Sequence, residues 1–244
     1  MWLMSHAIGA THTQLLARDS FTDDEAGKIE AVISRRVSGE PLQYILGVAD
    51  FYGRDFAVGP GVLIPRHDTE TLIDGVKKVF AHDEAFRFLD WGTGSGCLAV
   101  TILLEFPNAS GAAVDVSGEA LSYARENAER WGVVDRAEFG DNGGEFALIV
   151  SNPPYIPSCE IAGLQREIRD FEPTLALDGG HDGMRYYREL QGLAMMRLKR
   201  GGYLVLEAGD LGQVRELCGM EGFTLAGKIL DGGNFPRCII MRRN

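Results

Sequence analysis

A regular alternation of short apolar runs and amphipathic stretches, from residue 86 to the end of the chain, constrains the fold more than any other feature. The apolar runs predict strands at residues 87–90, 112–115, 137–139, 148–151, 203–207, 223–229 and 238–242. The stretches between them predict helices at residues 98–104, 119–130, 184–198 and 211–220. Strands that alternate with helices indicate an α/β fold, with a doubly wound sheet and right-handed crossovers.

The N-terminal part of the chain differs from this repeat and predicts a short helical region at residues 1–45. Thr22 and Glu25 have the spacing of a capping box, so a helix is expected to begin there. The apolar stripe expected on this helix consists of Ala26, Ile29, Ile33 and Val37. Two short helices cannot bury a core alone, so we expect them to pack on the remainder of the chain.

Residues 46–65 predict a β-hairpin linker whose turn lies at Gly53. A loop interrupted by proline comes next and leads into a further helix. The apolar stripe of that helix is Leu72, Ile73, Val76, Val79 and Phe80. We therefore expect the main domain to span residues 66–244.

The chain carries a net charge of −11 at neutral pH. A domain that grips a polyanion normally has a basic face, so this charge argues against nucleic acid and favours proteins and small molecules as partners. The four cysteines form no Cys-x-x-Cys pair, and the five histidines show no metal-ligand spacing. We expect reduced thiols, no metal site and a cytoplasmic location. No apolar run approaches the roughly 18 residues of a membrane span, and no signal-peptide pattern opens the chain.

The strand expected at residues 148–151 runs into the tetrapeptide Asn152-Pro153-Pro154-Tyr155. Proline cannot donate into a strand ladder, so this strand ends at the carboxyl edge of the sheet, where open α/β sheets bind ligands. The prolines leave backbone carbonyls and the Asn152 side-chain oxygen free to accept hydrogen bonds. A planar group with an –NH2 fits such acceptors, and the Tyr155 ring is suited to lie against its face. Taken alone, the tetrapeptide is equally typical of a proline-rich strand exit without chemistry.

Three glycines, Gly92, Gly94 and Gly96, follow the first strand of the repeat and precede a helix. Glycine permits a sharp turn and the close approach of a ligand, and the helix N-terminus supplies oriented N–H groups. A dinucleotide fingerprint needs its third glycine at position 97, which is Cys97, so nicotinamide and flavin cofactors fit poorly. Asp115 ends the next strand, where an acidic side chain accepts both hydroxyls of a ribose. This layout is expected for S-adenosylmethionine, although a glycine turn alone is also compatible with no ligand.

Five segments, through their order and spacing, carry a resemblance to a known family. They are residues 41–47 (PLQYILG), residues 63–66 (LIPR) with Thr69 and Glu70, residues 90–96 (DWGTGSG), residues 152–156 (NPPYI), and Glu172-Pro173 with Ala176-Leu177. From residue 41 to its end the chain resembles the class I S-adenosylmethionine-dependent methyltransferases with a Rossmann-like sheet, and within them the HemK/PrmC group. That group methylates the side-chain amide nitrogen (N5) of the glutamine in the Gly-Gly-Gln loop of peptide chain release factors, with S-adenosylhomocysteine as co-product.

The resemblance also implies roles for individual residues. It implies cofactor contacts from Asp90, Gly92, Thr93, Gly94, Ser95, Gly96, Asp115, Asp141, Asn142 and Asn152. It implies catalytic roles for Asn152 and Pro153, which accept hydrogen bonds from the two amide N–H groups of the substrate glutamine. It also implies a catalytic role for Tyr155, which shapes the slot that receives this glutamine side chain. It implies substrate contacts from Arg66, Glu70, Asn152, Pro153, Pro154, Tyr155 and Glu172. Finally, it implies that residues 1–45 dock the protein substrate and that residues 66–244 are the catalytic domain.

Three other functions remain open from the sequence. Related methyltransferases modify a glutamine of a ribosomal protein, although the segment at residues 64–70 favours a release factor. The exocyclic amine of adenine in a nucleic acid also offers a planar –NH2 group, although the acidic charge argues against such a substrate. The third alternative is a protein that binds the cofactor without catalysis.

Overall fold

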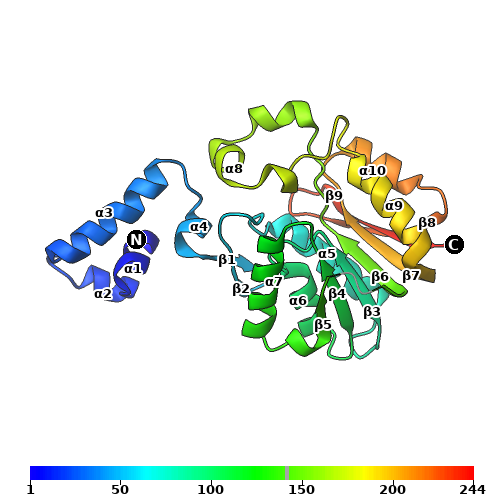
Figure 1. Cartoon of the computed structure of the whole chain (residues 1–244), viewed down its shortest axis with the longest axis horizontal. Coiled ribbons are helices and arrows are strands. Elements are labelled where there is room, and N and C mark those ends of the chain that lie inside the picture. The colour runs from blue at the N-terminus through cyan, green and yellow to red at the C-terminus, as the bar shows by residue number, and fades with distance from the viewer. Residues whose placement is uncertain (141–142) are drawn as a thin grey trace.

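The computed structural model describes residues 1–140 and 143–244 and contains a seven-stranded sheet with helices on both faces (Figure 1). Its strands are β3 (Arg87–Trp91), β4 (Ser110–Val114), β5 (Ala137–Phe139), β6 (Phe146–Ser151), β7 (Leu198–Glu207), β8 (Phe223–Leu230) and β9 (Pro236–Arg243). The strand order is β5-β4-β3-β6-β7-β9-β8, and β9 runs antiparallel to both of its neighbours. The predicted α/β fold is therefore confirmed, and every predicted strand is present.

The winding of the chain reverses between β3 and β6. The strands β4 and β5 lie on one side of β3, whereas β6 and β7 lie on the other. In an open parallel sheet such a reversal leaves a crevice outside the carboxyl ends of the two strands. The glycine turn follows β3 and the Asn-Pro-Pro-Tyr segment follows β6, and these strands pair directly, with Asp90 opposite Val150. Both motifs therefore lie at the same edge of the sheet.

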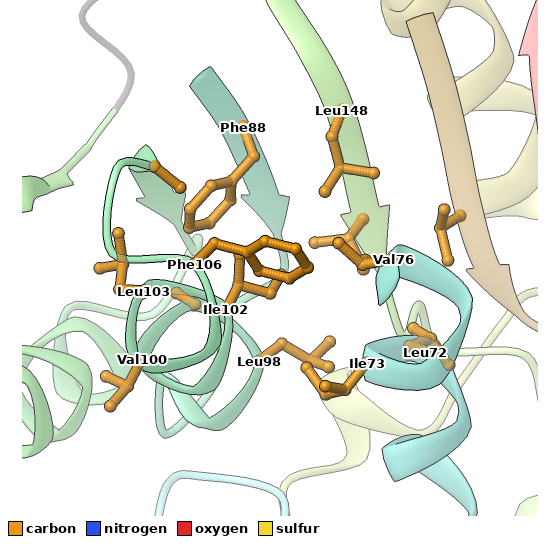
Figure 2. Packing of buried hydrophobic residues seen from close by; sticks show 14 of the residues in the cluster. Leu72, Ile73, Val76, Phe88, Leu98, Val100, Ile102, Leu103, Phe106 and Leu148 are labelled. Atoms are coloured by element: carbon orange, nitrogen blue, oxygen red, sulfur yellow. The ribbon is translucent and has the colours of Figure 1, made fainter. Parts of the chain in front are cut away.

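Helices cover both faces of the sheet and bury the apolar strands between them. On one face lie α5 (Glu70–Val79), α6 (Cys97–Glu105) and α7 (Gly118–Arg130), and on the other lie α9 (Arg185–Arg197) and α10 (Leu211–Cys218). Figure 2 shows Leu72, Ile73 and Val76 of α5 meeting Leu98 and Ile102 of α6, beneath Phe88 of β3 and Leu148 of β6. Burial on both faces explains why these strands are continuous apolar runs.

The N-terminal helical region consists of α1 (Trp2–Ile8), α2 (His12–Leu16), α3 (Asp23–Val37) and α4 (Leu42–Leu46). The helices α1–α3 lie at one end of the molecule, away from the sheet (Figure 1). The predicted capping box is present, because the Thr22 hydroxyl accepts from the Glu25 amide and the Glu25 carboxylate accepts from the Thr22 amide. None of the helices within residues 1–140 and 143–244 has the length and hydropathy that a membrane span requires.

The apolar stripe predicted for α3 is partly wrong. Ile29 is buried as expected, together with Val32, but Ala26, Ile33 and Val37 are exposed. A helix turns by about 100° per residue, so the three exposed positions lie on one side of Ile29 and Val32 on the other. The helix α3 packs against α1 and α4, and of its apolar residues only Ile29 and Val32 are buried in the structure.

The hairpin linker is formed by β1 (Val48–Phe51) and β2 (Arg54–Ala57), which pair antiparallel as predicted. Tyr52 and Gly53 at its turn have φ angles of 54° and 69°, which are typical of a two-residue hairpin loop. The remaining helical elements are short: η1 (His67–Thr69), η2 (Val134–Arg136), η3 (Ser158–Gly163), α8 (Arg166–Phe171) and η4 (Thr174–Ala176). Of these, η3, α8 and η4 lie in the long segment between β6 and α9, to which the sequence pattern assigned no element.

Candidate active site

The glycine turn after β3 leaves open space beside two of its glycines in the described part of the chain. The amides of Gly92 and Thr93 both donate to the carbonyl of Val114, 2.9 Å away, which ties the turn to the end of β4. Gly92 and Gly94 have φ angles of +72° and +55°, and a Cβ atom at either position would meet nothing within 4 Å. The backbone therefore favours glycine at both positions and lets a ligand approach the main chain closely. This cradle fits the methionine part of S-adenosylmethionine.

Asp90, at the end of β3, supports the turn from inside. Its Oδ2 atom accepts a hydrogen bond of 2.6 Å from the Thr93 hydroxyl and one of 3.1 Å from the Ala99 amide. Burial raises the pKa of the Asp90 carboxyl to about 7, and these two bonds oppose the rise. The Oδ1 atom is buried without a partner among the described residues. A donor group of a cofactor, such as an ammonium, is the kind of partner that such an acceptor lacks.

Asp115 joins the end of β4 to the glycine turn. Its Oδ2 atom accepts from the Gly94 amide and its Oδ1 atom from the Ser117 amide, both at 2.9 Å. Each carboxylate oxygen has more than one lone pair, so both remain able to accept from ribose hydroxyls. The structure thus places Asp115 beside the turn that the sequence paired with it.

The Asn-Pro-Pro-Tyr segment leaves its acceptors free at the end of β6. The Ser151 hydroxyl donates to the Trp91 carbonyl, 2.6 Å away, and so ties the ends of β6 and β3 together. The Asn152 Nδ2 atom donates to the Thr69 hydroxyl, 2.9 Å away. No donor within residues 1–140 and 143–244 is hydrogen-bonded to Oδ1 of Asn152 or to the carbonyl oxygen of Pro153. Both acceptors are therefore available to a ligand.

Tyr155 is held in place by β7, by α10 and by the loop that joins them. Its hydroxyl donates to Oε1 of Glu207 at 3.1 Å, and its carbonyl accepts from Nε2 of Gln213 at 2.9 Å. A Cβ atom at position 209 would lie 2.5 Å from the Tyr155 ring, so glycine there lets the backbone approach the ring closely. The ring is therefore part of a fixed wall.

Comparison with known proteins adds the family to this geometry. Residues 1–47 match the PrmC N-terminal domain, and residues 68–168 match the methyltransferase small domain. The release factor glutamine methyltransferase of Koribacter versatilis is 41% identical over 230 residues, covering 91% of this chain and 81% of that protein. The enzyme of that name from Geobacter sulfurreducens is 41% identical over 226 residues, covering 90% and 78%. The chain belongs to the release factor glutamine methyltransferase family.

Solved structures agree with this family membership at the level of the fold. A methyltransferase from Pyrococcus furiosus superposes with a TM-score of 0.54 at 22% identity, covering 88% of this chain and 96% of that chain. The 16S rRNA N2 G1207 methyltransferase of T. thermophilus has a TM-score of 0.55 at 15% identity, covering 81% and 49%. The Rossmann-like methyltransferase fold predicted from the sequence is thus confirmed for this family member.

Two of the residues predicted to contact the substrate have carboxylates that are already hydrogen-bonded within the protein. Glu172 is buried, and its two carboxylate oxygens accept from the Ile64 amide, 3.0 Å away, and from the Arg66 guanidinium. Glu70 accepts from the Tyr52 amide at the hairpin turn, 2.9 Å away. In the described part of the chain, neither carboxylate hydrogen-bonds to the Asn-Pro-Pro-Tyr segment. Arg66 keeps 35% of its side chain exposed. The predicted adenine neighbours Asp141 and Asn142 lie outside the described residues.

Two residues that the sequence analysis did not assign to the site lie against it. Thr69 bonds to Asn152, and Glu207 bonds to Tyr155. Burial raises the pKa of the Glu207 carboxyl to about 7, and the hydroxyls of Thr69 and Tyr155 oppose this rise. A signal for Glu207 was present in the sequence, because it is an acidic residue that ends an apolar strand, as Asp90 is.

One group of potential metal ligands occurs in the described part of the chain, outside the slot. Ligand atoms of Asp50, His67 and Glu70 lie within 4.8 Å of one another. Asp50 and His67 are exposed, and Glu70 is already bonded to the Tyr52 amide. The histidine spacing in the sequence did not indicate this group, because Asp50 comes from the hairpin.

Proposed function

We propose that this protein transfers a methyl group from S-adenosylmethionine to the side-chain amide nitrogen of a glutamine in the Gly-Gly-Gln loop of a peptide chain release factor. The observation that carries the proposal is the pair of unoccupied acceptors, Oδ1 of Asn152 and the Pro153 carbonyl, at the strand end next to the glycine turn. Membership of the family supports the same substrate.

The chemistry requires positioning more than acid or base. A glutamine amide nitrogen is a poor nucleophile because its lone pair is delocalised into the carbonyl. Asn152 and Pro153 would each accept one N–H of this nitrogen, which fixes its direction and increases its electron density. Such positioning supplies on the order of 7 kcal/mol or more of the barrier in favourable cases. Acceptor oxygens that face the nitrogen also stabilise the positive charge that develops there during transfer.

The cofactor would be held by the glycine turn and by Asp115. When bound, S-adenosylmethionine would supply a methyl group on a sulfonium: the S–CH3 bond breaks as the N–CH3 bond forms, the nitrogen gives up one proton to solvent, and S-adenosylhomocysteine is the co-product. The Gly92 and Gly94 backbone would surround its methionine part, while the Asp115 carboxylate would accept the ribose hydroxyls. Asp90 would support the cofactor site indirectly, because the hydrogen bond that it accepts from Thr93 maintains the shape of the glycine turn.

A protein substrate agrees with the charge and the domain organisation. The net charge of −11 disfavours a polyanion, so a nucleic-acid amine is the less favoured acceptor of the methyl group. We propose that residues 1–45 dock the release factor, that residues 46–65 act as a linker, and that residues 66–244 carry out the transfer. Translation takes place in the cytoplasm, so this substrate would place the enzyme there.

The test is incubation of the protein with labelled S-adenosylmethionine and purified release factors, followed by mapping of the modified residue by mass spectrometry. We expect one methyl group on the glutamine of the Gly-Gly-Gln loop. Asn152→Ala is expected to lower turnover by about 10²- to 10³-fold, because one of the two acceptors is lost, while cofactor affinity is unchanged. Asn108→Ala, a change in an exposed loop, is the matched control. Methylation of DNA or of a ribosomal protein in preference to the release factor would refute the proposal.

A further inference from the structure

The Gln213 side chain joins the Asn-Pro-Pro-Tyr segment to the loop that follows β7. It lies in the first turn of α10 and is 3% exposed, so water has little access to its hydrogen bonds. Its Nε2 atom donates to the Tyr155 carbonyl, 2.9 Å away, and its Oε1 atom accepts from the Gly209 amide, 2.7 Å away. Both ends of one carboxamide are therefore bound to the main chain, on two segments that are distant in the sequence.

The partners of this carboxamide fix its orientation. A carbonyl only accepts hydrogen bonds and a backbone N–H only donates, so the nitrogen faces Tyr155 and the oxygen faces Gly209. The Tyr187 hydroxyl, which donates to the Glu207 carbonyl at 2.8 Å, lies 3.3 Å from the same oxygen. A neutral amide matches this set of partners, whereas a carboxylate would place an acceptor against the Tyr155 carbonyl.

Capping of α10 does not explain these contacts. Asp210 is the N-cap of this helix, and its side chain accepts from the Gln213 amide at 2.9 Å. At this spacing a capping box would direct the glutamine side chain back to the amide of the N-cap residue. The Gln213 side chain instead binds the Gly209 amide, one residue earlier, and the Tyr155 carbonyl of another segment. Its contacts therefore serve the neighbouring segments and not only the helix that carries it.

The backbone is packed closely around Tyr155 where Gln213 binds. A Cβ atom at position 183 would lie 2.4 Å from the Tyr155 carbonyl oxygen, and one at position 209 would lie 2.5 Å from the Tyr155 ring. Gln213 thus ties the Tyr155 main chain to the same residue, Gly209, that packs on the Tyr155 ring. We propose that Gln213 is a positioning residue, which holds Tyr155 and the Pro153 carbonyl in the geometry that methyl transfer requires. This inference rests on the proposed function and deepens it.

Loss of the bond to Tyr155 is expected to act on turnover and not on the cofactor. Proline fixes φ, so Pro154 forms a stiff link through which a shift of Tyr155 is passed to the Pro153 carbonyl. A misplacement of about 1 Å costs on the order of 10²-fold in rate. Over the portion of the chain that the structure describes, Gln213 makes no hydrogen bond to the glycine turn or to Asp115.

Gln213→Glu is the sharpest test, because it keeps the shape and the acceptor for Gly209 but loses the donor for Tyr155. At pH 8 we expect kcat for the release factor to fall at least about tenfold. The cofactor should still raise the melting temperature as in wild type. Burial and the facing carbonyl raise the pKa of the introduced carboxyl. A protonated carboxyl donates again, so kcat relative to wild type should rise at least about threefold from pH 8 to pH 6.

The titratable and charged groups around position 213 are shared by the variant and wild type, so the ratio of the two kcat values cancels their own titration. They are Tyr155, Tyr187, Asp210 and Glu207, which are hydrogen-bonded to Gln213 or to its partners, and Arg237 and Asp68, which act on Tyr155 through space.

Two further variants separate positioning from a merely structural effect. Gln213→Met has a similar shape without the polar atoms, so its kcat should be low at both pH values and should not recover. Gln191→Glu on α9 is the matched control, since it also removes a glutamine donor from a backbone carbonyl, that of Glu221 at 3.1 Å. Glu221 lies just before β8, at the opposite edge of the sheet, so this variant should keep the wild-type kcat at both pH values.

Three results would overturn the positioning role of Gln213. They are a wild-type kcat in Gln213→Glu at pH 8, a loss in that variant that is equal at pH 6 and pH 8, and an equally large loss in Gln191→Glu. Urea unfolding establishes that each variant is folded during the assay. If Gln213→Glu does not fold, Gln213→Met decides, and a wild-type kcat there would overturn the role. An inactive wild-type protein would instead refute the proposed function, so the two failures are distinguishable.

Discussion

Buried carboxyl groups support the candidate site, and their partners differ. Glu172 is matched by the Arg66 guanidinium and a backbone amide, which is the arrangement that makes a buried charge tolerable. Asp90 and Glu207 have hydroxyl or amide partners, and burial raises the pKa of each to about 7. The Glu172 carboxylate fixes the loop before α5 to the segment that follows α8. The other two lie at strand ends, where Asp90 binds Thr93 of the glycine turn and Glu207 binds Tyr155 of the Asn-Pro-Pro-Tyr segment.

The raised pKa of Asp90 has a consequence for stability. The folded-state pKa of about 7 exceeds the unfolded value, so between them the folded protein holds a proton that the unfolded chain has lost. This contribution is complete at low pH and is lost as pH rises through 7. Without ligand, we expect wild type to lose about 3 kcal/mol of unfolding free energy relative to Asp90→Asn between pH 5 and pH 8. Urea unfolding at both pH values measures it.

The matched pair cancels other titrations, because Glu207 and all surface groups are present in both proteins. A difference between wild type and Asp90→Asn that stays constant across this pH range would contradict the raised pKa of Asp90.

At the scale of elements, local sequence patterns predicted the strands and the helices that pack on them well. Apolar periodicity is a local property, and burial on both faces of the sheet makes each central strand a continuous apolar run. The prediction of which side of α3 is buried was partly wrong, because tertiary packing decides which neighbour covers a helix and on which side. Similarly, the contact between Thr69 and Asn152 could not be predicted, since this hydrogen bond joins residues 83 positions apart.

The exit of the chain from β6 depends on close packing with a distant loop. The Ile156 amide donates to the Leu177 carbonyl at 3.1 Å, and the Gly179 amide donates to the Ile156 carbonyl at 2.8 Å. A Cβ atom at position 179 would lie 2.8 Å from the carbonyl oxygen of Pro154 and from the Cα atom of Tyr155. Backbone atoms cannot give way as side chains do, so glycine is required there for space and not for φ.

We therefore expect Gly179→Ala to displace the Asn-Pro-Pro-Tyr segment. The free energy of unfolding should fall by about 1–3 kcal/mol, which is the usual cost of overpacking, and kcat should fall with it. The control is Gly192→Ala in the exposed part of α9, where a Cβ atom would meet nothing within 4 Å. That change should stabilise the protein by up to about 1 kcal/mol. Equal stability of the two variants, measured by urea unfolding, would contradict this account.

At the scale of the whole molecule, the N-terminal helical region contacts the segment that follows the Asn-Pro-Pro-Tyr sequence. Arg36 of α3 forms an ion pair of 2.8 Å with Glu167 of α8. The chain at Gly39 also lies next to α8, since a Cβ atom at this position would be 3.4 Å from Nε of Arg166. The Tyr44 hydroxyl donates to the Val62 carbonyl. A release factor bound to the helical region would therefore lie next to the segment that follows the Asn-Pro-Pro-Tyr sequence.

The exposed apolar ridge of α3 suits such a contact. Ile33 and Val37 are 43% and 77% exposed, on the side of the helix opposite to the buried Val32. In Ile33→Gln/Val37→Gln, the loss of about 1.4 kcal/mol from the two apolar contacts should raise KM for the intact release factor by about tenfold. Glutamine is a good helix former, so the unfolding free energy and the cofactor-induced rise in melting temperature should not change.

The control variant is Glu30→Gln on the same helix. A short Gly-Gly-Gln peptide is too small to reach α3, so its methylation by the double variant should match that by wild type. An equal rise of KM for protein and peptide would show that the ridge acts on the slot, and an unchanged KM for both would show that release factors dock elsewhere.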